Sequence, residues 1–550
     1  MTGLEQAFEQ IGTAAEHHLT VSHAAGLALA VTDREDVLGV VCRGMADVAA
    51  RAPVRPETRF QIGSISKSFA SLLVLREAEA GRLDLHVSVN EILPWLGLPE
   101  PFGPITLHHL MTHMAGIIVG TEDAPTGPGA LLRLRGLPAT RAPGERFLYS
   151  NDGWKVVGAC LEEVTGRRVH DLIAERLLEP LEMRSSTGAI RDAVWTDLAV
   201  GYQPMYTDRP PQLRHPLLAS PRIVSNTADG SIVSNVLDMS AYARLILARG
   251  DVADGLGGRI ASEEVFGRWV EQRVDDGEGG TYGYGWWQDQ QDGLRWIAHS
   301  GGMVGYTAFL AVSPDEGLGV AILQNGEGRK RSLARAAFAT VRASLAGDEL
   351  PAPWIPPAPT DVQKAADYEG RYEGDDGRVL EITETEGGLL VSIGSVSIRP
   401  ERDPLAEPQD VFVMPHDALE LHALEFVRDE AGTVVEAFLG STWFRGERYQ
   451  GPEPDAIPEG WHRYVGLYRN DDPWAPTLRI VIRKGRLVLR LPAAVTDDDG
   501  GGTLVPLGDD AFAVGSEDEP SRLRFIGAGA GGLAVIAELD GGSWFRSFED

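Results

Sequence analysis

Cysteine and long apolar runs are both scarce in this sequence. The only cysteines among 550 residues, Cys42 and Cys160, lie in apolar segments, which predicts buried thiols rather than a disulfide or a metal site. The longest apolar run, Ala24 to Val31, is far shorter than the roughly 20 residues that a membrane helix needs. The acidic start of the chain lacks the basic and apolar regions of a secretory signal. We therefore expect a cytoplasmic protein with no membrane partner.

Basic residues are few relative to acidic ones. Fifty Lys and Arg stand against 80 Asp and Glu, which gives a net charge of −30. Binding to nucleic acid or to an anionic membrane surface requires clustered Lys and Arg. The balance argues against both partners, and we interpret it as a contribution to solubility.

The first part of the chain mixes strands and helices, and its length predicts more than one domain. The apolar patterns predict a hairpin over 25–31 and 37–41, helices over 64–81, 153–165 and 332–345, and strands over 281–287, 294–298, 306–312 and 318–323. Strands at both ends with helices between them predict an α+β domain over 1–346, an α/β sandwich whose central antiparallel sheet uses both ends of the region. Five prolines between Pro351 and Pro359 predict a stiff linker over 347–361.

The C-terminal part repeats itself. Tyr368 to Tyr372 (YEGRY) returns as Tyr464 to Tyr468 (YVGLY), and the WFR at 443–445 returns at 544–546. Each repeat has room for roughly eight short strands, the size of a small closed barrel.

We therefore predict two all-β domains, small antiparallel barrels of the lipocalin-like type, over 362–455 and 456–550. The acidic run from Asp497 to Gly500 lacks the spaced oxygen ligands of a Ca²⁺ loop, so we interpret it as a solvated hairpin turn.

Ser64 and Lys67 form the first chemical motif. Ser64 stands at the start of a predicted helix, where the helix dipole favours a developing negative charge. Lys67 lies one turn later on the same face, and a lysine with a lowered pKa can activate a serine. The pattern S-x-x-K is weak alone, but it predicts Ser64 as the nucleophile and Lys67 as its base.

Two further motifs follow along the chain. In Tyr149-Ser150-Asn151 a phenol can transfer a proton to a leaving group, and Asn151 offers a donor and an acceptor for a substrate amide. In His299-Ser300-Gly301-Gly302 the small residues let a substrate approach a strand edge, and the N–H of Gly302 can join that of Ser64 as an oxyanion donor.

In this order the three motifs resemble those of the serine β-lactamase and penicillin-binding-protein superfamily, S-x-x-K, Y-x-N and H-x-G. The likeness extends over about residues 10–345 through the segments 107–116, 143–166 and 179–183. A tyrosine in the second motif and a histidine in the third resemble the class C-like branch. Within it, the D-aminopeptidase group is similar in having two C-terminal eight-stranded barrels, and there a loop of the last barrel reaches the active site.

The resemblance implies a role for each motif residue. Ser64 forms an acyl-enzyme, while Lys67 and Tyr149 share the proton that leaves Ser64 and later reaches the leaving group. Asn151 holds the substrate amide. His299, with Gly301 beside it, takes the place of the family's Lys-Thr-Gly and binds substrate. No cofactor and no metal are implied.

Several functions remain open at this point. We expect a hydrolase acting on an amide or peptide with an N-terminal D-residue. The alternatives are a carboxylesterase on small acyl esters, an acyltransferase or peptide cyclase using the same acyl-enzyme, and a catalytically silent binding protein. The substrate is a small molecule or peptide, and a homo-oligomer is compatible with the sequence.

Two other sites would explain parts of the same sequence, a different serine nucleophile and a zinc site. Ala298 to Gly302 fits a nucleophile elbow with Ser300 as nucleophile, but an elbow requires a strand–turn–helix, whereas 303–312 has the pattern of a second strand. His108, His109 and His113 cluster in sequence without the spacing of an H-E-x-x-H zinc site, so we expect them to be structural.

Overall fold

The computed structural model describes residues 3–118, 120, 128–252, 258–291, 293–404, 410–491 and 502–547. The chain forms two compact units. The first comprises Met1–Gln203 and Ala219–Ile355 and contains the three motifs. The second comprises Pro204–Leu218 and Pro356–Asp550 and contains the two repeats.

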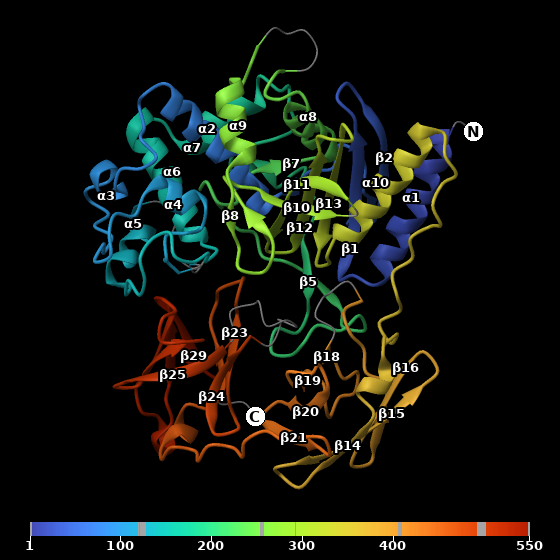
Figure 1. Ribbon diagram of the computed structural model, residues 1–550, viewed down its shortest axis with the longest axis vertical. Helices are drawn as coiled ribbons and strands as arrows, with labels where there is room; N and C mark the ends of the chain where they lie inside the picture. Colours follow the sequence, from blue (N-terminus) through green and yellow to red (C-terminus); the bar gives the residue numbers. More distant parts are fainter. Residues whose placement is uncertain are drawn as a thin grey trace. The chain divides into compact units, whose positions relative to one another are not determined.

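A nine-stranded antiparallel sheet forms the centre of the first unit (Figure 1). In sheet order its strands are β3 (Ala52–Pro53), β2 (Val37–Asp47), β1 (Ala24–Thr32), β13 (Leu318–Gly326), β12 (Tyr306–Ser313), β11 (Leu294–Met303), β10 (Trp287–Gln291), β9 (Thr281–Tyr282) and β8 (Val274–Asp275). Strand β1 pairs with β13, so the two ends of the unit meet inside the sheet, which confirms the predicted fold class. Two short sheets pair β4 (Phe60–Gln61) with β7 (Val233–Ser234) and β5 (Tyr202–Pro204) with β6 (Leu217–Ala219).

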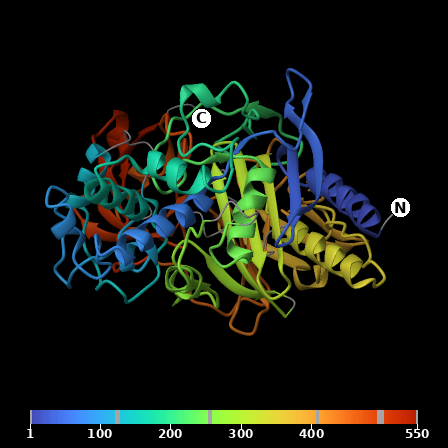
Figure 2. The same cartoon turned by 90° about the horizontal axis from the view of Figure 1, so that it is seen from above.

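Helices cover both faces of this sheet (Figure 2). Successive side chains of β1 point to opposite faces of the sheet, as the two-residue period of a strand requires. Leu27 and Leu29 belong to the core between the sheet and helices α1 (Gly3–Thr20) and α10 (Arg331–Ala346). Ala28 and Ala30 belong to the core on the other face. The helices that contribute buried residues to that second core include α2 (Ser66–Glu79), α4 (Leu107–Met111), α6 (Asn151–Thr165), α7 (Val169–Ile173), α8 (Val236–Leu247) and α9 (Glu263–Glu271). Two further short helices are α3 (Val89–Ile92) and α5 (Pro128–Leu131).

Three predicted elements differ locally from the observed ones. The helix expected from residue 64 begins with a 3-10 turn over Gly63–Ile65 before α2. Helix α6 begins two residues early, at Asn151, because the Ser150 hydroxyl accepts the N–H of Gly153 as an N-cap. The strand expected over 281–287 divides into β9 and β10 at Gly285, whose φ of 84° and close approach to the Ser68 backbone exclude a side chain.

The two repeats of the second unit have the same number of strands. In the second repeat, β22 (Gly466–Arg469), β23 (Thr477–Arg483), β24 (Arg486–Arg490), β25 (Gly502–Gly508), β26 (Ala511–Val514), β27 (Arg522–Ile526), β28 (Ile536–Leu539) and β29 (Gly542–Arg546) close into a barrel. In the first, an eight-stranded sheet runs in the order β17 (Val396–Ile398), β16 (Gly388–Ile393), β15 (Val379–Thr385), β14 (Gly370–Gly374), β21 (Thr442–Gly446), β20 (Val434–Leu439), β19 (Leu424–Arg428) and β18 (Val411–Phe412). Its edge strands β17 and β18 are not paired with each other within the described residues.

The repeated tyrosines make the same contacts in both repeats. The hydroxyl of Tyr372 donates to the carbonyl of Tyr368 at 2.9 Å, and that of Tyr468 donates to the carbonyl of Tyr464 at 2.7 Å. The sequence repeat is therefore a structural repeat. The acidic run over 497–500 lies outside the described residues.

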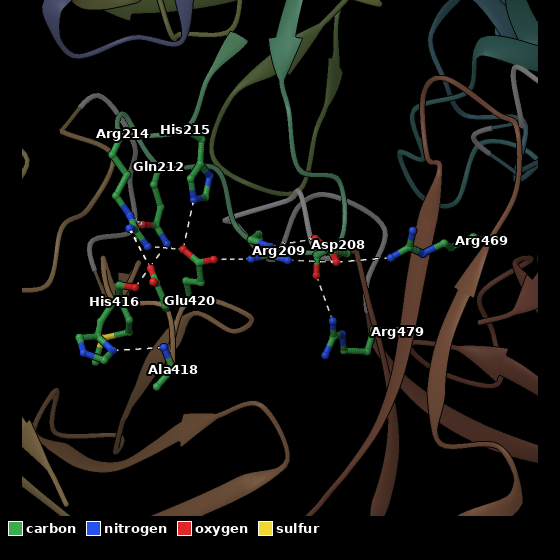
Figure 3. A network of polar contacts seen from close by, with 12 residues as sticks. Asp208, Arg209, Gln212, Arg214, His215, His416, Ala418, Glu420, Arg469 and Arg479 are labelled. Carbon is green, nitrogen blue, oxygen red and sulfur yellow. Dashed lines mark hydrogen bonds and ion pairs between the residues drawn. The ribbon is translucent and has the colours of Figure 1, made fainter. Parts of the chain in front are cut away.

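The segment Pro204–Leu218 belongs to the second unit, which the sequence did not predict. The carboxylate of Glu420 accepts hydrogen bonds from Arg209 and Arg214 and lies 3.4 Å from Nε2 of His215 (Figure 3). The Glu420 side chain is 10% exposed, so this is a nearly buried carboxylate with two guanidinium partners.

The two cysteines are free thiols, Cys160 buried and Cys42 half-buried. Within the described ranges, no helix combines the length and apolar character needed to cross a membrane.

Candidate active site

Ser64 lies where the 3-10 turn before α2 meets strand β11. The backbone at Gly63 has φ 53°, and a Cβ there would lie 2.6 Å from the carbonyl oxygen of Gly302. A Cβ on Gly301 would lie 1.9 Å from the carbonyl oxygen of Ile62. Only glycine fits at either position, and the absence of both side chains lets the third motif approach the half-buried Ser64.

Lys67 lies at the centre of the site. Its ammonium donates to the Ser64 hydroxyl oxygen at 2.9 Å, to Oδ1 of Asn151 at 2.8 Å and to the carbonyl oxygen of Asp229 at 2.9 Å. The side chain is fully buried. Three neutral oxygens therefore hold one buried cation against the serine, and among the described residues no carboxylate forms an ion pair with it.

The second motif joins this cluster from the start of α6. Asn151 is the first residue of that helix, and its carbonyl oxygen faces Lys67, which leaves its amide N–H groups for other partners. The ring centroid of Tyr149 lies 5.0 Å from the Lys67 nitrogen. The tertiary structure thus brings Ser64, Lys67, Tyr149 and Asn151 together from segments some 80 residues apart.

The third motif contributes its backbone, while the imidazole of its histidine is buried. Nδ1 of His299 lies 2.5 Å from the carbonyl oxygen of Ser300 and therefore carries the proton, and Nε2 accepts the hydroxyl of Tyr282 at 3.1 Å. Burial, reinforced by the charge of Lys67, lowers the pKa of His299 to about 3. The imidazole is neutral, and both of its nitrogens have partners inside the protein.

The segments that carry the two predicted oxyanion donors, Ser64 and Gly302, pack closely. The backbone nitrogen of Gly302 lies 2.7 Å from the point where a Cβ of Gly63 would be, and the nitrogen of Ser64 lies 3.3 Å from the corresponding point on Gly301. The role of their N–H groups as oxyanion donors stays a prediction.

Three residues that contact the site were not predicted from the sequence as part of it. Asp229 supplies a carbonyl oxygen to Lys67, a role no side-chain pattern reveals. Tyr282 holds His299, and its own segment contains no motif. His113, predicted to be a structural histidine, stacks on Tyr149 with ring centroids 4.1 Å apart.

Comparison of the sequence with known protein families shows which family the chain belongs to. A family model described as Beta-lactamase matches residues 8–344, more than half of the chain. The chain belongs to the Beta-lactamase family. The cluster around Lys67 and the whole nine-stranded sheet lie inside this family match, and both C-terminal repeats lie outside it.

Relatives of this Beta-lactamase family member include penicillin-binding protein 4 of Amycolatopsis lactamdurans, 28% identical over 372 residues, which are 65% of this chain and 95% of that protein. Among solved structures, the octameric penicillin-binding protein homologue from Pyrococcus abyssi has 25% identity and a TM-score of 0.54 over 80% of this chain and 98% of its own. A D-stereospecific amidohydrolase from Streptomyces sp. has 21% identity and a TM-score of 0.51 over 60% of this chain and 98% of its own.

The two rival sites do not have the geometry they require. Ser300 lies inside strand β11, which is followed by strand β12 rather than by a helix, so the nucleophile elbow is wrong. Of the three clustered histidines, His108 contacts the hydroxyl of Tyr284, His109 caps helix α4, and His113 faces Tyr149. Within the described part of the chain, no group of three or more His, Cys, Asp or Glu is placed to hold a metal.

Proposed function

We propose that this Beta-lactamase family member is a serine hydrolase that forms an acyl-enzyme on Ser64. The observation that carries the proposal is the buried Lys67 nitrogen held between the Ser64 hydroxyl, Asn151 and the Asp229 carbonyl. A lysine surrounded by neutral acceptors can give up its proton more easily than one paired with a carboxylate, and it lies within hydrogen-bonding distance of its nucleophile.

The proposed reaction proceeds in two halves. The pair of Lys67 and Tyr149 takes the hydroxyl proton of Ser64 as its oxygen attacks the substrate carbonyl carbon. The N–H groups of Ser64 and Gly302 stabilise the oxyanion. Collapse breaks the bond to the leaving group, which takes the proton from Tyr149.

Deacylation uses the same groups in reverse. Water attacks the acyl carbon, its proton passes to the pair of Lys67 and Tyr149, and Ser64 recovers its proton as the acid leaves. Asn151, with its oxygen on Lys67, presents its N–H groups to the substrate amide carbonyl.

The buried His299 supports a particular class of substrate. A neutral imidazole with both nitrogens engaged offers no cation to a substrate carboxylate. This weighs against carboxypeptidase and β-lactamase activity and favours substrates without a carboxylate at that position. The motif pattern and the two C-terminal repeats resemble the D-aminopeptidase group, so we propose a peptidase or amidase acting after an N-terminal D-residue.

A substrate panel tests this proposal. D- and L-aminoacyl p-nitroanilides are compared with p-nitrophenyl esters of short acids, with Ser64→Ala as the control. Turnover of D-anilides that is lost in Ser64→Ala supports the aminopeptidase. Inert anilides with ester turnover favour the carboxylesterase, and product formation only with an added amine favours acyl transfer. No turnover and no fluorophosphonate adduct on Ser64 favours the silent binding protein.

Self-association is a separate proposal. It is supported by the structural neighbour from Pyrococcus abyssi, which is described as octameric. Light scattering coupled to gel filtration tests it: a mass that is a multiple of 59.4 kDa supports an oligomer, and a monomer at micromolar concentration overturns it.

A further inference from the structure

Tyr149 is held on both sides along the chain by one residue, His113. The N–H of Leu148, just before the tyrosine, donates to the His113 carbonyl at 2.8 Å. The N–H of Ser150, just after it, donates to Nδ1 of the His113 ring at 2.9 Å. Between these two contacts the rings of Tyr149 and His113 stack at 4.1 Å with 28° between their planes.

The surroundings of the His113 ring exclude a positive charge. Besides Ser150, the indole N–H of Trp154 points toward Nε2 at 3.2 Å. A neutral imidazole has one acceptor nitrogen, which can satisfy one of these two N–H groups, whereas a protonated imidazole has none and would leave both N–H groups facing a donor. Burial, with the charge of Lys67 next in importance, acts in the same direction and holds the pKa of His113 well below its usual range.

The backbone at His113 is held in a rarely used conformation. Its φ is 59° and the residue is 1% exposed. A non-glycine residue with positive φ persists when the surrounding structure demands it. Its ring also lies 4.7 Å from that of Tyr282, the residue that holds His299. His113 thus contacts both Tyr149 of the second motif and Tyr282, which is hydrogen bonded to the histidine of the third motif.

We propose that His113 is a positioning residue for Tyr149: as a neutral ring it fixes the plane of the phenol beside Lys67 and leaves the lysine as the single cation there. This inference rests on the proposed serine hydrolase function. It concerns proton delivery by Tyr149, so His113 itself touches neither substrate nor the reacting atoms.

Two variants separate the two parts of this role. His113→Asn keeps an acceptor for the Ser150 N–H and tolerates positive φ, but it removes the stacked ring. His113→Phe keeps a ring and removes the acceptor nitrogen. Each preserves the backbone contact to Leu148. Activity is normalised to the fraction of Ser64 that reacts with a fluorophosphonate, and thermal unfolding checks the fold.

The readout is the dependence on the leaving group. p-Nitroaniline needs a proton to leave, whereas p-nitrophenolate does not, so a misplaced Tyr149 affects the anilide more. We expect kcat/KM of both variants to fall about tenfold on the active D-anilide and less than about threefold on the matched ester. Equal losses on both substrates would overturn the proposal, because a general loss of structure does not distinguish leaving groups.

A double-mutant cycle with Tyr149→Phe provides the second readout. If His113 acts through Tyr149, His113→Asn has almost no further effect in the Tyr149→Phe background. Multiplicative losses would place His113 in an independent role and overturn the inference.

Two controls keep the outcomes distinct. If the wild type shows no Ser64-dependent turnover, the proposed function fails. The double-mutant cycle of His113 and Tyr149 is then measured from the rates at which a fluorophosphonate labels Ser64. If neither variant folds, histidine ¹⁵N shifts of the wild type decide: a ring of His113 that stays neutral from pH 8 to pH 5 supports the proposal, and a charged ring at pH 6 overturns it.

Discussion

Lys67 and Glu420 are both buried charged groups, and they are surrounded in opposite ways. The ammonium of Lys67 meets three neutral oxygens. The carboxylate of Glu420 meets the guanidinium groups of Arg209 and Arg214. A buried carboxylate paired in this way has its opposite charge supplied within the fold, whereas the three hydrogen-bond acceptors of Lys67 carry no formal charge. The proposed function assigns the reactive role to Lys67 and a structural role to Glu420.

A second buried lysine also has neutral hydrogen-bond partners. Lys330 is 5% exposed and donates to the hydroxyl of Thr307 and the carbonyl of Gly328. It differs from Lys67 in two ways: the negative charge of Glu327 acts on it, and its hydroxyl partner, Thr307, itself donates to the Gly326 carbonyl at 2.6 Å.

The largest expected effect comes from removing the cation itself. Lys67→Met should lower kcat/KM about a thousandfold, equivalent to about 4 kcal/mol of transition-state stabilisation, because Ser64 loses its base. Steady-state kinetics on the active substrate measure it, with thermal unfolding as the folding control. A loss below tenfold in a folded protein would show that Lys67 is not the base.

Giving Lys67 a counter-charge should make its environment resemble that of Glu420. Asn151→Asp places a carboxylate 2.8 Å from the ammonium, where Asn151 Oδ1 now lies, and a neighbouring opposite charge raises the pKa of a lysine. The acid limb of kcat/KM should move upward by about one pH unit, which reduces activity at a pH on that limb about tenfold.

Asn151→Ala is the matched control for this change. It removes the same acceptor without adding charge, so activity should fall without the shift of the acid limb. An unshifted profile in Asn151→Asp would show that the charge on Lys67 does not control the reaction.

Removing the charge from Glu420 should affect stability alone. Glu420→Gln removes the carboxylate that Arg209 and Arg214 share, although Asp208 and Asp417 remain beside them, and should lower the free energy of unfolding by about 2 kcal/mol. This loss is smaller than that expected for a fully buried ion pair because the Arg214 side chain is 40% exposed. Thermal and urea unfolding of the full chain measure it.

The control is Glu453→Gln, which breaks an ion pair with Arg445 in which the Glu453 side chain is 78% exposed. It should change stability by less than about 0.5 kcal/mol. Activity per reactive Ser64 should be the same in both variants and the wild type. An equal free energy of unfolding in the two variants would show that burial of Glu420 does not increase the contribution of its ion pairs to stability.

The smallest effect concerns Lys330. Burial lowers its pKa from 10.5 to about 7. Between these values the unfolded chain binds more protons than the folded one, so the free energy of unfolding rises with pH. From pH 7 to pH 8 the gain is about 1 kcal/mol. Lys330→Met should remove this part of the pH dependence in urea unfolding, and parallel profiles of variant and wild type would contradict it.

Much of the local structure could be predicted because it depends on short-range patterns. The three-residue spacing of Ser64 and Lys67 placed them on one helical face, and they are hydrogen bonded. The alternating apolar residues of β1 predicted a strand, and the repeated tyrosines predicted a structural repeat. The motifs resembled those of a known family, and the family match over residues 8–344 confirmed that resemblance.

The features that the sequence did not reveal depend on contacts between distant segments. The contact of His299 with substrate stays a prediction, but the hydrogen bond between its ring and Tyr282 has no signal in the sequence pattern around it. The segment Pro204–Leu218 has no pattern that assigns it to the second unit, because its partners, such as Glu420, lie some 200 residues away.

The sequence by itself predicted which groups carry the chemistry and in what order: a serine with a lysine one turn later, then a tyrosine, an asparagine and a glycine-lined strand. Only the tertiary structure decided the burial of His113 and His299, the neutral hydrogen-bond partners of Lys67 and the two-sided hold of His113 on Tyr149. The physical reason is that spacing along a helix or strand is a local property, whereas desolvation and hydrogen-bond partners arise when segments far apart in the chain pack together.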